Sequence, residues 1–323
     1  MNRRTRRCIF ICSLFLVYSY LSRQAPTKTF FAPAFVESVE NRNFTSTELS
    51  SVRSIHDESG FVFVMFVDED FLKMTLSWLC HAPTSVTLKT IFFVSSREVR
   101  KSLELFGAKH FKSLNSRLHR GKRKAKQYGQ KTYYQLINDR ARLVGQLLHH
   151  HLKVWIIESD STWFADPTEV LVQFQDQDVI AGKDGEGKDE FPEAGFVFLN
   201  STLRTRNLWD NMVIWQQRVI DEMEQDDVGD AGNEMLQLPE MLRQANCSWS
   251  YFPASNFVSG KWYLSWHIRS MSSPIVIQNN WIIGTKDKIR RAQQWGHWYL
   301  HPRGDTCLMT RESMPHQSIY LRR

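Results

Sequence analysis

The chain has 323 residues, of which 42% are hydrophobic and 23% are charged. These proportions are ordinary for a globular protein and exclude a mainly disordered chain, and the length favours one domain of about 250 residues with extensions. The formal net charge is +7. Four arginines lie within the first seven residues, so part of this charge does not belong to the fold.

An uncharged segment, residues 8–22, follows the basic start. It is short for a membrane-spanning helix of roughly 20 residues, and a basic start before a short apolar core is also typical of a signal peptide. The bulky Tyr18 and Tyr20 argue against a cleavage site. We therefore expect residues 1–7 to form a cytosolic tail and residues 8–22 an uncleaved signal-anchor helix, whose shortness matches a thin early-secretory membrane.

This topology places the rest of the chain in the lumen. Three N-x-[ST] sequons are then open to glycosylation, at Asn43, Asn200 and Asn246. Cys80, Cys247 and Cys307 are then lumenal, and the simplest count is one disulfide and one free thiol, with the pairing left open. The absence of a C-x-x-C spacing argues against a structural zinc site.

Residues 23–58 mix proline, serine, threonine and asparagine with charges and show no sustained periodicity. This composition is typical of a flexible stem. Order is expected to begin near Gly60, so the folded lumenal domain is expected to occupy residues 59–323.

The chain from Gly60 to Asp160 alternates between strand and helix patterns. Strands are predicted at 61–67, 90–94 and 154–157, and helices at 71–81, 97–106 and 132–151, the last with Thr132 as its N-cap. This alternation predicts a parallel α/β sheet. Arg140 interrupts the apolar stripe of the last helix and is expected to reach toward the edge of the sheet.

Residues 114–131 are strongly basic. Such a segment in isolation suggests nucleic-acid binding, but the N-terminal anchor argues against it, so we expect no nucleic-acid partner. A solvated lumenal loop and a loop that closes over an anionic donor are the two remaining interpretations.

The second half continues with short strands and helices. Strands are predicted at 178–182, 196–199 and 274–284, and helices at 203–223, from about Met235 after a glycine-containing loop, and at 286–298. Neither G-x-G-x-x-G after the first strand, nor Walker A, nor G-x-S-x-G occurs in the chain.

Residues 154–167, VWIIESDSTWFADP, carry Glu158 and Asp160 directly after a buried strand. Alternate side chains of a strand point to one side, and ligands of α/β sheets lie beyond the carboxyl ends of the strands. Two carboxylates there favour Mg²⁺ or Mn²⁺, which would neutralise the diphosphate of a departing nucleotide. A solvated acidic turn is the alternative. Trp163 and Trp281 are expected to be core residues rather than sugar platforms.

This stretch resembles the D-x-D-x-x-W-x-x-D-P block of the nucleotide-diphospho-sugar transferase family, which includes plant rhamnogalacturonan xylosyltransferases and extensin arabinosyltransferases. Glu158 takes the place of the first Asp of that block. The other matches to the family's motifs are Asp160, Trp163, Asp166, Pro167, Gly195, Phe196, Asn233, Asn280, Gly284 and Lys288. The similarity spans about residues 60–300.

The resemblance implies a GT-A-type α/β fold, a Rossmann-like mixed sheet flanked by helices, in a single-pass type II Golgi membrane protein. It implies transfer of a sugar from a nucleoside-diphosphate donor, expected to be a UDP-sugar, to a hydroxyl of a glycan or glycoprotein, assisted by Mn²⁺ or Mg²⁺. The metal would be held by Asp160 and Glu158, with Gln278 as a third ligand. The donor would be bound by Arg140, Glu158, Asp160, Asn233, Asn280 and Lys288. Glu193 or Asp230 would be the catalytic carboxylate near the acceptor or the anomeric carbon.

Three residues depart from the family's motifs, and the D-Q pair that precedes the asparagine in the family's D-Q-x-x-x-N element is lost before Asn233. Glu158 lengthens the arm of the first acid, Gln278 replaces a histidine with a weaker ligand for Mn²⁺, and Glu193 replaces an asparagine. They support an alternative function, that of a catalytically weakened or inactive glycosyltransferase-fold protein that acts as a glycan-binding or scaffold protein. A glycoside hydrolase is disfavoured, because Glu158 and Asp160 are too close to flank a scissile sugar bond.

Overall fold

The computed structural model describes residues 43–114, 129–174, 176–185, 190–224, 229 and 232–308, all within one compact unit, Asn41–Arg323. The expected cytosolic tail, the anchor and most of the basic segment lie outside these residues. Among the residues described, no helix is both long enough and apolar enough to cross a membrane.

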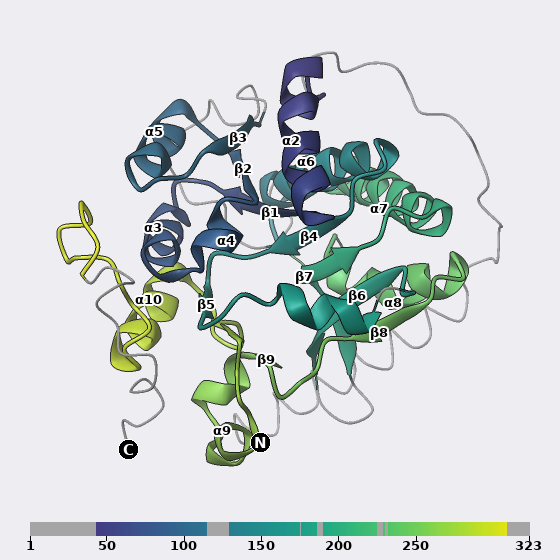
Figure 1. Ribbon diagram of the computed structural model, residues 1–323. Helices are drawn as coiled ribbons and strands as arrows, with labels where there is room; N and C mark the ends of the chain where they lie inside the picture. The colour runs from purple at the N-terminus through teal and green to yellow at the C-terminus, as the bar shows by residue number, and fades with distance from the viewer. Residues whose placement is uncertain are drawn as a thin grey trace. The chain divides into compact units, whose positions relative to one another are not determined.

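A seven-stranded mixed sheet in the order β3-β2-β1-β4-β7-β6-β8 forms the centre of the fold (Figure 1). Its strands are β1 (Val62–Val67), β2 (Thr90–Val94), β3 (His110–Ser113), β4 (Val154–Ile157), β6 (Val179–Asp184), β7 (Phe191–Leu199) and β8 (Trp249–Tyr251). The strands β3, β2, β1 and β4 run parallel, as the alternation of strands and helices predicts. The strand β7 lies antiparallel to both β4 and β6, which makes the sheet mixed.

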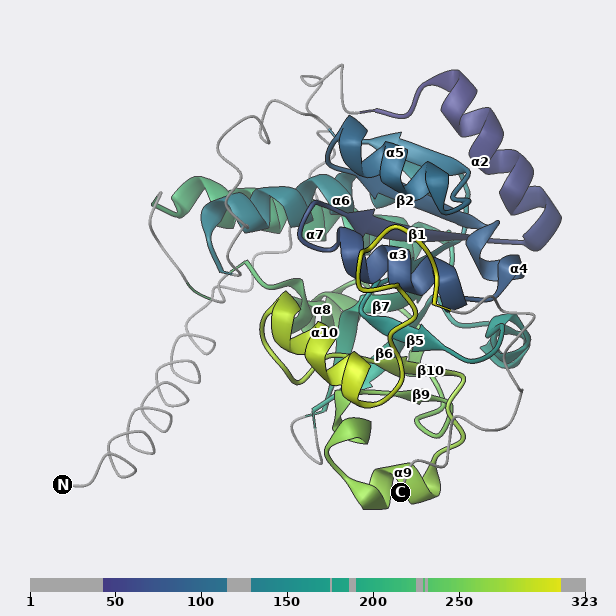
Figure 2. The ribbon, with the colours of Figure 1, turned by 90° about the vertical axis from the view of Figure 1, so that its left-hand side faces the viewer.

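Helices cover both faces of this sheet, and each strand contributes alternate side chains to each face. Val62 and Val64 of β1 join a core with α2, α6, α7 and α8, whereas Phe63 and Met65 join a core with α3 and α5. Figures 1 and 2 show α6 and α7 on one side of the strands and α3 and α5 on the other. The helices are α2 (Ser46–Ser59), α3 (Leu72–His81), α4 (Thr84–Thr87), α5 (Arg97–Leu105), α6 (Lys131–His149), α7 (Leu203–Glu222), α8 (Glu234–Gln244), α9 (Trp266–Met271) and α10 (Thr285–Gln294).

The helix α2 corrects the expectation that order begins near Gly60. The side chain of Thr45 accepts from the backbone of Glu48, and the carboxylate of Glu48 accepts from the backbone N–H of Thr45, which is a capping box. Val52 and Ile55 of α2 are buried in the core. The polar composition of the segment hid these two apolar residues, so residues 43–58 belong to the folded domain rather than to a stem.

A second, smaller sheet lies beside the first, with the strand order β5-β10-β9. Its strands are β5 (Ser161–Trp163), β9 (Phe257–Val258) and β10 (Val276–Gln278). The strand predicted at 274–284 is therefore shorter than expected, because the residues after Gln278 leave the sheet. The antiparallel pair β5–β10 brings the end of β10 beside Asp160, since Gln278 pairs with Ser161.

Two helix termini also differ from the predictions. The helix α6 begins at Lys131, and Gln130, which precedes it, makes no side-chain cap, so Thr132 is not the N-cap. The helix α10 ends at Gln294, earlier than predicted, and Gly296 follows with a left-handed φ of 72°. Glycine adopts this conformation readily and commonly terminates helices.

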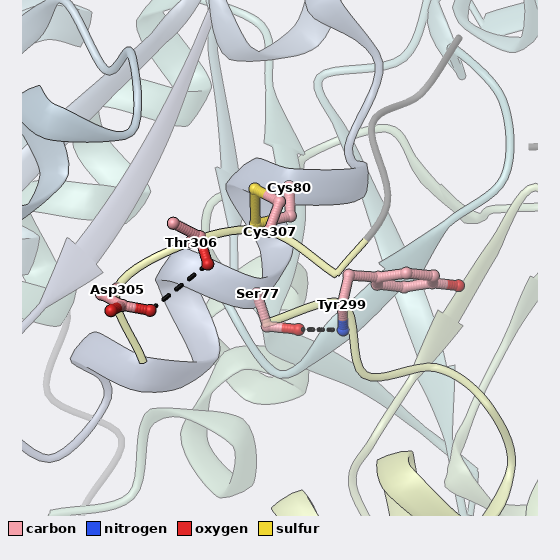
Figure 3. The surroundings of a disulfide bond; sticks show 6 residues. All are labelled: Ser77, Cys80, Tyr299, Asp305, Thr306 and Cys307. Carbon is pink, nitrogen blue, oxygen red and sulfur yellow. Dashed lines mark hydrogen bonds between the residues drawn. A yellow bond between two sulfur atoms is a disulfide. The ribbon is translucent and has the colours of Figure 1, made fainter. Parts of the chain in front are cut away.

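The disulfide joins Cys80 of α3 to Cys307 near the end of the described chain, and Cys247 is free (Figure 3). This agrees with the expected count of one disulfide and one thiol. Beside the disulfide, the backbone N–H of Tyr299 donates to Ser77 Oγ at 2.9 Å, so the segment after α10 is fastened to α3 twice (Figure 3).

Candidate active site

Glu158 and Asp160 lie on the turn that joins β4 to β5. The E-x-D spacing predicts that both residues continue the strand. Instead, β4 ends at Ile157, and the two residues belong to the turn. Asp160 is buried, whereas the side chain of Glu158 is 44% exposed. The loss of surrounding water and the neighbouring Asp160 carboxylate raise the pKa of Glu158. The two acids are therefore close enough to repel each other.

Two buried or half-buried cations face this pair from different helices. Lys288 Nζ of α10 lies 2.5 Å from Asp160 Oδ2. The guanidinium of Arg140, on α6, has its Nη1 4.0 Å from Glu158 Oε1 and also contacts the carboxylate of Glu234. Arg140 therefore reaches the carboxyl edge of the sheet, as predicted from its place in the apolar stripe.

The network around Arg291 holds α10, and with it Lys288, in position. Arg291 Nε donates to Asn279 Oδ1 at 2.6 Å, and Asn279 Nδ2 donates to the backbone oxygen of Lys288 at 2.8 Å. The backbone N–H of Asn279 in turn donates to the backbone oxygen of Asp160 at 2.7 Å. This chain of bonds fixes the carboxylate and the ammonium relative to each other.

Glu193 reaches the site through an irregularity in the sheet. The pairing of β6 with β7 skips between Ala181 and Gly182, so Gly182 lies opposite Glu193. Such bulges commonly redirect a side chain next to an active site. Burial first, and then the charges of Glu158 and Asp184, raise the pKa of Glu193 well above its ordinary value.

The two oxygens of the Glu193 carboxylate have different surroundings. Oε1 lies 3.3 Å from Asn280 Nδ2, and the side chain of Gln278 also bonds to this carboxylate, whereas Oε2 is buried and meets no hydrogen-bond partner at standard geometry in the described part of the chain. A buried carboxylate oxygen without a partner is costly, so it indicates a place where a ligand or ion completes the site.

Gln278 ends the strand β10, and Asn280 follows it two residues later beside Glu193. Asn280 Nδ2 also donates to Gln278 Oε1 at 3.2 Å, and Asn280 Oδ1 accepts from the backbone N–H of Gly260 at 2.5 Å. The structure therefore brings together Arg140, Glu158, Asp160, Glu193, Gln278, Asn280 and Lys288 of the residues that the sequence singled out.

The backbone of Gly195, in β7, lies against the carboxylate of Glu158 in the acidic turn. A Cβ atom placed at Gly195 would lie 2.4 Å from the carboxyl carbon of Glu158, which is closer than atoms can approach. The absence of a side chain at this position of β7 therefore leaves the space in which the Glu158 carboxylate lies.

Asn233 and Asp230 are not placed in the site. The side chain of Asn233 caps α8 by accepting from the backbone N–H of Met235 at 3.0 Å, and Asp230 lies outside the described residues. The next residue, Glu234, is the one that contacts Arg140, and Gln216 Nε2 holds its other oxygen at 2.8 Å. The sequence predicted no role for Glu234. The helix N-cap at Asn233, however, marks Glu234 as the first residue of a helix that begins beside the predicted site residue.

Trp163 and Trp281 have opposite environments. Trp163 is buried, as expected, and packs in an aromatic cluster with Trp155 and Phe196. Trp281 is 46% exposed, so the expectation that it belongs to the core is wrong. It directly follows Asn280 and has a left-handed φ of 60°.

Comparison with known proteins places this site in a family. A family model of nucleotide-diphospho-sugar transferases matches residues 95–292, which is more than half of the chain. This range contains every residue assigned to the site above. Among curated proteins, none matches the chain.

Several solved glycosyltransferase structures are similar to this chain. They include the bifunctional glycosyltransferase WbbM in its apo form, with 14% identity, a TM-score of 0.43 and coverage of 72% of this chain and 49% of that one. GlyE of Streptococcus pneumoniae has 14% identity, a TM-score of 0.40 and coverage of 72% and 60%. Mouse xyloside xylosyltransferase 1 in its apo form has 10% identity, a TM-score of 0.41 and coverage of 68% and 98%. This chain thus spans about half of WbbM and three fifths of GlyE.

The family assignment rests on the family model, whose matched range includes the acidic turn, the Arg140 helix and Lys288. The resemblance noted from the E-x-D block is thereby confirmed. The chain belongs to the nucleotide-diphospho-sugar transferase family and, with it, to the glycosyltransferases.

Proposed function

We propose that the protein transfers a sugar from a nucleoside-diphosphate donor, which we expect to be a UDP-sugar, to a hydroxyl of a glycan or glycoprotein. The observation that carries the proposal is the convergence of the acidic turn with Arg140 and Lys288 at the carboxyl end of β4. Open α/β sheets bind nucleotides at this edge. Two fixed cations there stabilise the negative charge that develops on a departing diphosphate.

The charges of the site favour a divalent cation as the missing component. Arg140 contacts Glu234 and Lys288 contacts Asp160, while burial first and then the neighbouring carboxylates raise the pKa values of Glu158 and Glu193. Oxygen ligands of this kind suit Mg²⁺ or Mn²⁺.

The residues that would hold such an ion are Asp160 and Glu158, with the amide oxygen of Gln278 as a third ligand. Within the described ranges, no group of three or more histidine, cysteine and acidic side chains is arranged to hold a metal. The amide oxygen of Gln278 and the donor's own phosphates are the further ligands that we propose. When bound, the ion would supply electrostatic stabilisation of the leaving diphosphate. Lys288 would then orient Asp160 and share the charge of the diphosphate.

Glu193 is the candidate catalytic carboxylate among the described residues. It is 4% exposed, contacts Asn280 and lies opposite Gly182 in the pairing of β6 with β7. A catalytic base for the transfer must reach the acceptor hydroxyl. A raised pKa makes the carboxylate a stronger base, because its pKa then lies closer to the pH of the reaction. Asp230, the other candidate, remains a prediction.

The cellular setting is part of the proposal: a single-pass type II Golgi membrane protein, anchored by residues 8–22, with the catalytic domain in the lumen. The disulfide between Cys80 and Cys307 suits an oxidising compartment, and the sequon residues Asn43 and Asn246 are exposed. Protease protection of a C-terminal epitope in sealed microsomes tests the topology, and digestion of that epitope without detergent would refute it.

The transferase activity is tested with the purified full chain in detergent. Release of UDP from a panel of UDP-sugars is measured with and without Mn²⁺, together with the Kd of UDP. We expect Asp160→Asn and Lys288→Ala to lower turnover about a hundredfold or more, because Asp160 would hold the metal ion and Lys288 would face the negative charge that develops on the leaving diphosphate. Lys286→Ala, on an exposed position of the same helix, is the matched control and should retain full turnover.

Two results decide between the transferase and the alternative function. Turnover that depends on Asp160 supports the transferase. A wild-type protein that neither binds UDP with Mn²⁺ nor releases it from any donor refutes the transferase and favours the glycan-binding or scaffold role.

A further inference from the structure

A groove opens beside the donor site, and its most exposed aromatic side chain is Trp281. The residues that line it are Gly185, Phe191, Lys261, Leu264, Ser265, Ile268 and Trp281, around roughly 960 Å³ of empty space open to solvent. Leu264 is 66% exposed, and the indole of Trp281 also remains accessible. The groove thus combines an aromatic ring and aliphatic side chains with polar groups at its rim.

The indole of Trp281 is held rigidly in this groove. Its Nε1–H donates to Asp184 Oδ1 at 2.8 Å, and the ammonium of Lys261 lies 4.0 Å from the centre of its ring. The Lys261 ammonium is itself fixed, because it donates to the backbone oxygen of Gly185 at 3.2 Å. A ring fixed in this way is pre-organised to receive a ligand.

The backbone at Trp281 is strained, and the residue before it maintains the strain. A bulky residue with a φ of 60° is an outlier of the kind that persists only where the surroundings enforce it, commonly at ligand sites. Two hydrogen bonds fix Asn280. Its side-chain Oδ1 accepts from the backbone N–H of Gly260, and its backbone oxygen accepts from the guanidinium of Arg291. A side chain at Gly260 would collide with that oxygen, so the close approach requires glycine.

The chain connects the groove to the part of the site where Glu193 lies. Asn280, which contacts Glu193, is the neighbour of Trp281 in the chain. Asp184, the partner of the indole, is two residues after Gly182, whose backbone packs against Glu193. Trp281 therefore lies one residue from a side chain that contacts Glu193, the carboxylate expected to face the acceptor hydroxyl.

From these observations we propose that the groove is the acceptor subsite and that it binds a glycan whose terminal sugar stacks on Trp281. The C–H face of a pyranose complements Leu264, Ile268 and the face of the indole opposite the Lys261 ammonium, while its hydroxyls meet the polar groups of the lining, Lys261 and Ser265. This assignment rests on the proposed transferase function. The order along the groove places the reacting hydroxyl toward Glu193 and the rest of the acceptor toward α9.

The test separates acceptor binding from donor binding. Full-length wild type and variants are assayed for UDP release with p-nitrophenyl glycosides of the common hexoses and pentoses as acceptors, and the Kd of UDP is measured on the same samples. We expect Trp281→Ala to raise the KM for the acceptor about tenfold or more, as is common for a tryptophan at the centre of a binding surface, without a comparable change in the Kd of UDP.

Two further variants control for the general effects of losing a tryptophan. Trp281→Phe keeps an aromatic face and should restore most of the acceptor affinity. Trp266→Ala removes a tryptophan that is 73% exposed on α9 but lies outside the lining of the groove, and it should leave the acceptor KM unchanged. An unchanged KM in Trp281→Ala, or an equal loss of UDP affinity, overturns the proposal.

The proposal stays testable if the wild type releases no UDP from any donor. Saturation-transfer NMR then measures direct binding of the same p-nitrophenyl glycosides to the full chain. Saturation that reaches a glycoside in the wild type and is lost in Trp281→Ala supports a glycan subsite on an inactive enzyme. A wild type that binds none of the glycosides refutes the subsite itself.

Discussion

The backbone of Gly195 lies so close to the carboxylate of Glu158 that one methyl group decides where that carboxylate can be. We expect Gly195→Ala to displace Glu158, because the new Cβ would lie 2.4 Å from its carboxyl carbon. Misplacing a catalytic group by about 1 Å can cost on the order of a hundredfold in rate, so turnover should fall at least tenfold. UDP release under saturating donor measures the effect.

The fold should survive this change, because the atoms that must give way are the end of a flexible side chain. Gly145→Ala is the matched control: a Cβ there meets Trp209 at an ordinary 3.5 Å, and alanine is about 1 kcal/mol better than glycine within a helix. That variant should keep its turnover and gain a little stability. Full activity in Gly195→Ala would show that the position of Glu158 is not critical.

At the scale of elements, Asp178 joins three of them. Its carboxylate, 1% exposed as a side chain, accepts from Thr202 at the N-terminus of α7, from Arg204 within α7 and from Ser248 before β8. Asp178 itself directly precedes β6. One buried charge therefore holds the beginnings of β6, β8 and α7 together.

We expect Asp178→Asn to lower the free energy of unfolding by about 3 kcal/mol at pH 7, because an amide offers one acceptor oxygen where the carboxylate uses two. Urea denaturation followed by tryptophan fluorescence measures the loss. Asp176→Asn, an exposed acid two residues earlier, is the control and should change stability little. Equal midpoints for wild type and Asp178→Asn would contradict the role of this charge.

The contribution of Asp178 to the free energy of unfolding is expected to depend on pH. Burial alone would raise the pKa of Asp178, but the hydrogen bonds from Arg204, Thr202 and Ser248 hold it below the ordinary value of 3.8. A lowered pKa means that the stabilisation is complete above the ordinary pKa and is lost as the pH falls through the folded one. The difference between wild type and Asp178→Asn should therefore be full at pH 7 and shrink below about pH 4.

The elements that the sequence revealed are those whose pattern is local. Val62–Val67, Thr90–Val94 and Val154–Ile157 are continuous apolar runs, and each is a strand of the large sheet near its predicted limits. The strands β5 and β9 have three and two residues, too few to show any period, and they form only because β10 pairs with both. Their positions follow from tertiary contacts rather than from local preference.

The same distinction applies to the site. Glu158, Asp160 and Lys288 could be identified from motifs, but their partners come from across the chain: Lys288 and Asp160 are 128 residues apart. Nothing local indicates that Glu234 contacts Arg140, or that Asp184 holds Trp281, since each contact exists only once the strands and helices have assembled. The residue types of the site were therefore predictable, and the contacts between them were not.

At the scale of the whole molecule, the disulfide between Cys80 and Cys307 closes a loop of 227 residues. It fastens the segment after α10 across α3, where Tyr299 and Leu300 join the core (Figure 3). Closing so long a loop removes chain entropy from the unfolded state, which corresponds to about 5 kcal/mol in the chain-entropy model. The bond thus stabilises most of the described fold.

We expect the double variant Cys80→Ser/Cys307→Ser to lose about 3–5 kcal/mol of this stability, which in a domain of this size lowers Tm by roughly 10 °C or more. The thermal midpoint under non-reducing conditions measures the loss, and adding a reductant should bring the wild type down to the same value. Cys247→Ser removes the free thiol and should leave the midpoint unchanged. If the reductant leaves the thermal midpoint of the wild type unchanged, the disulfide does not stabilise the fold. Packing alone would then hold the segment after α10.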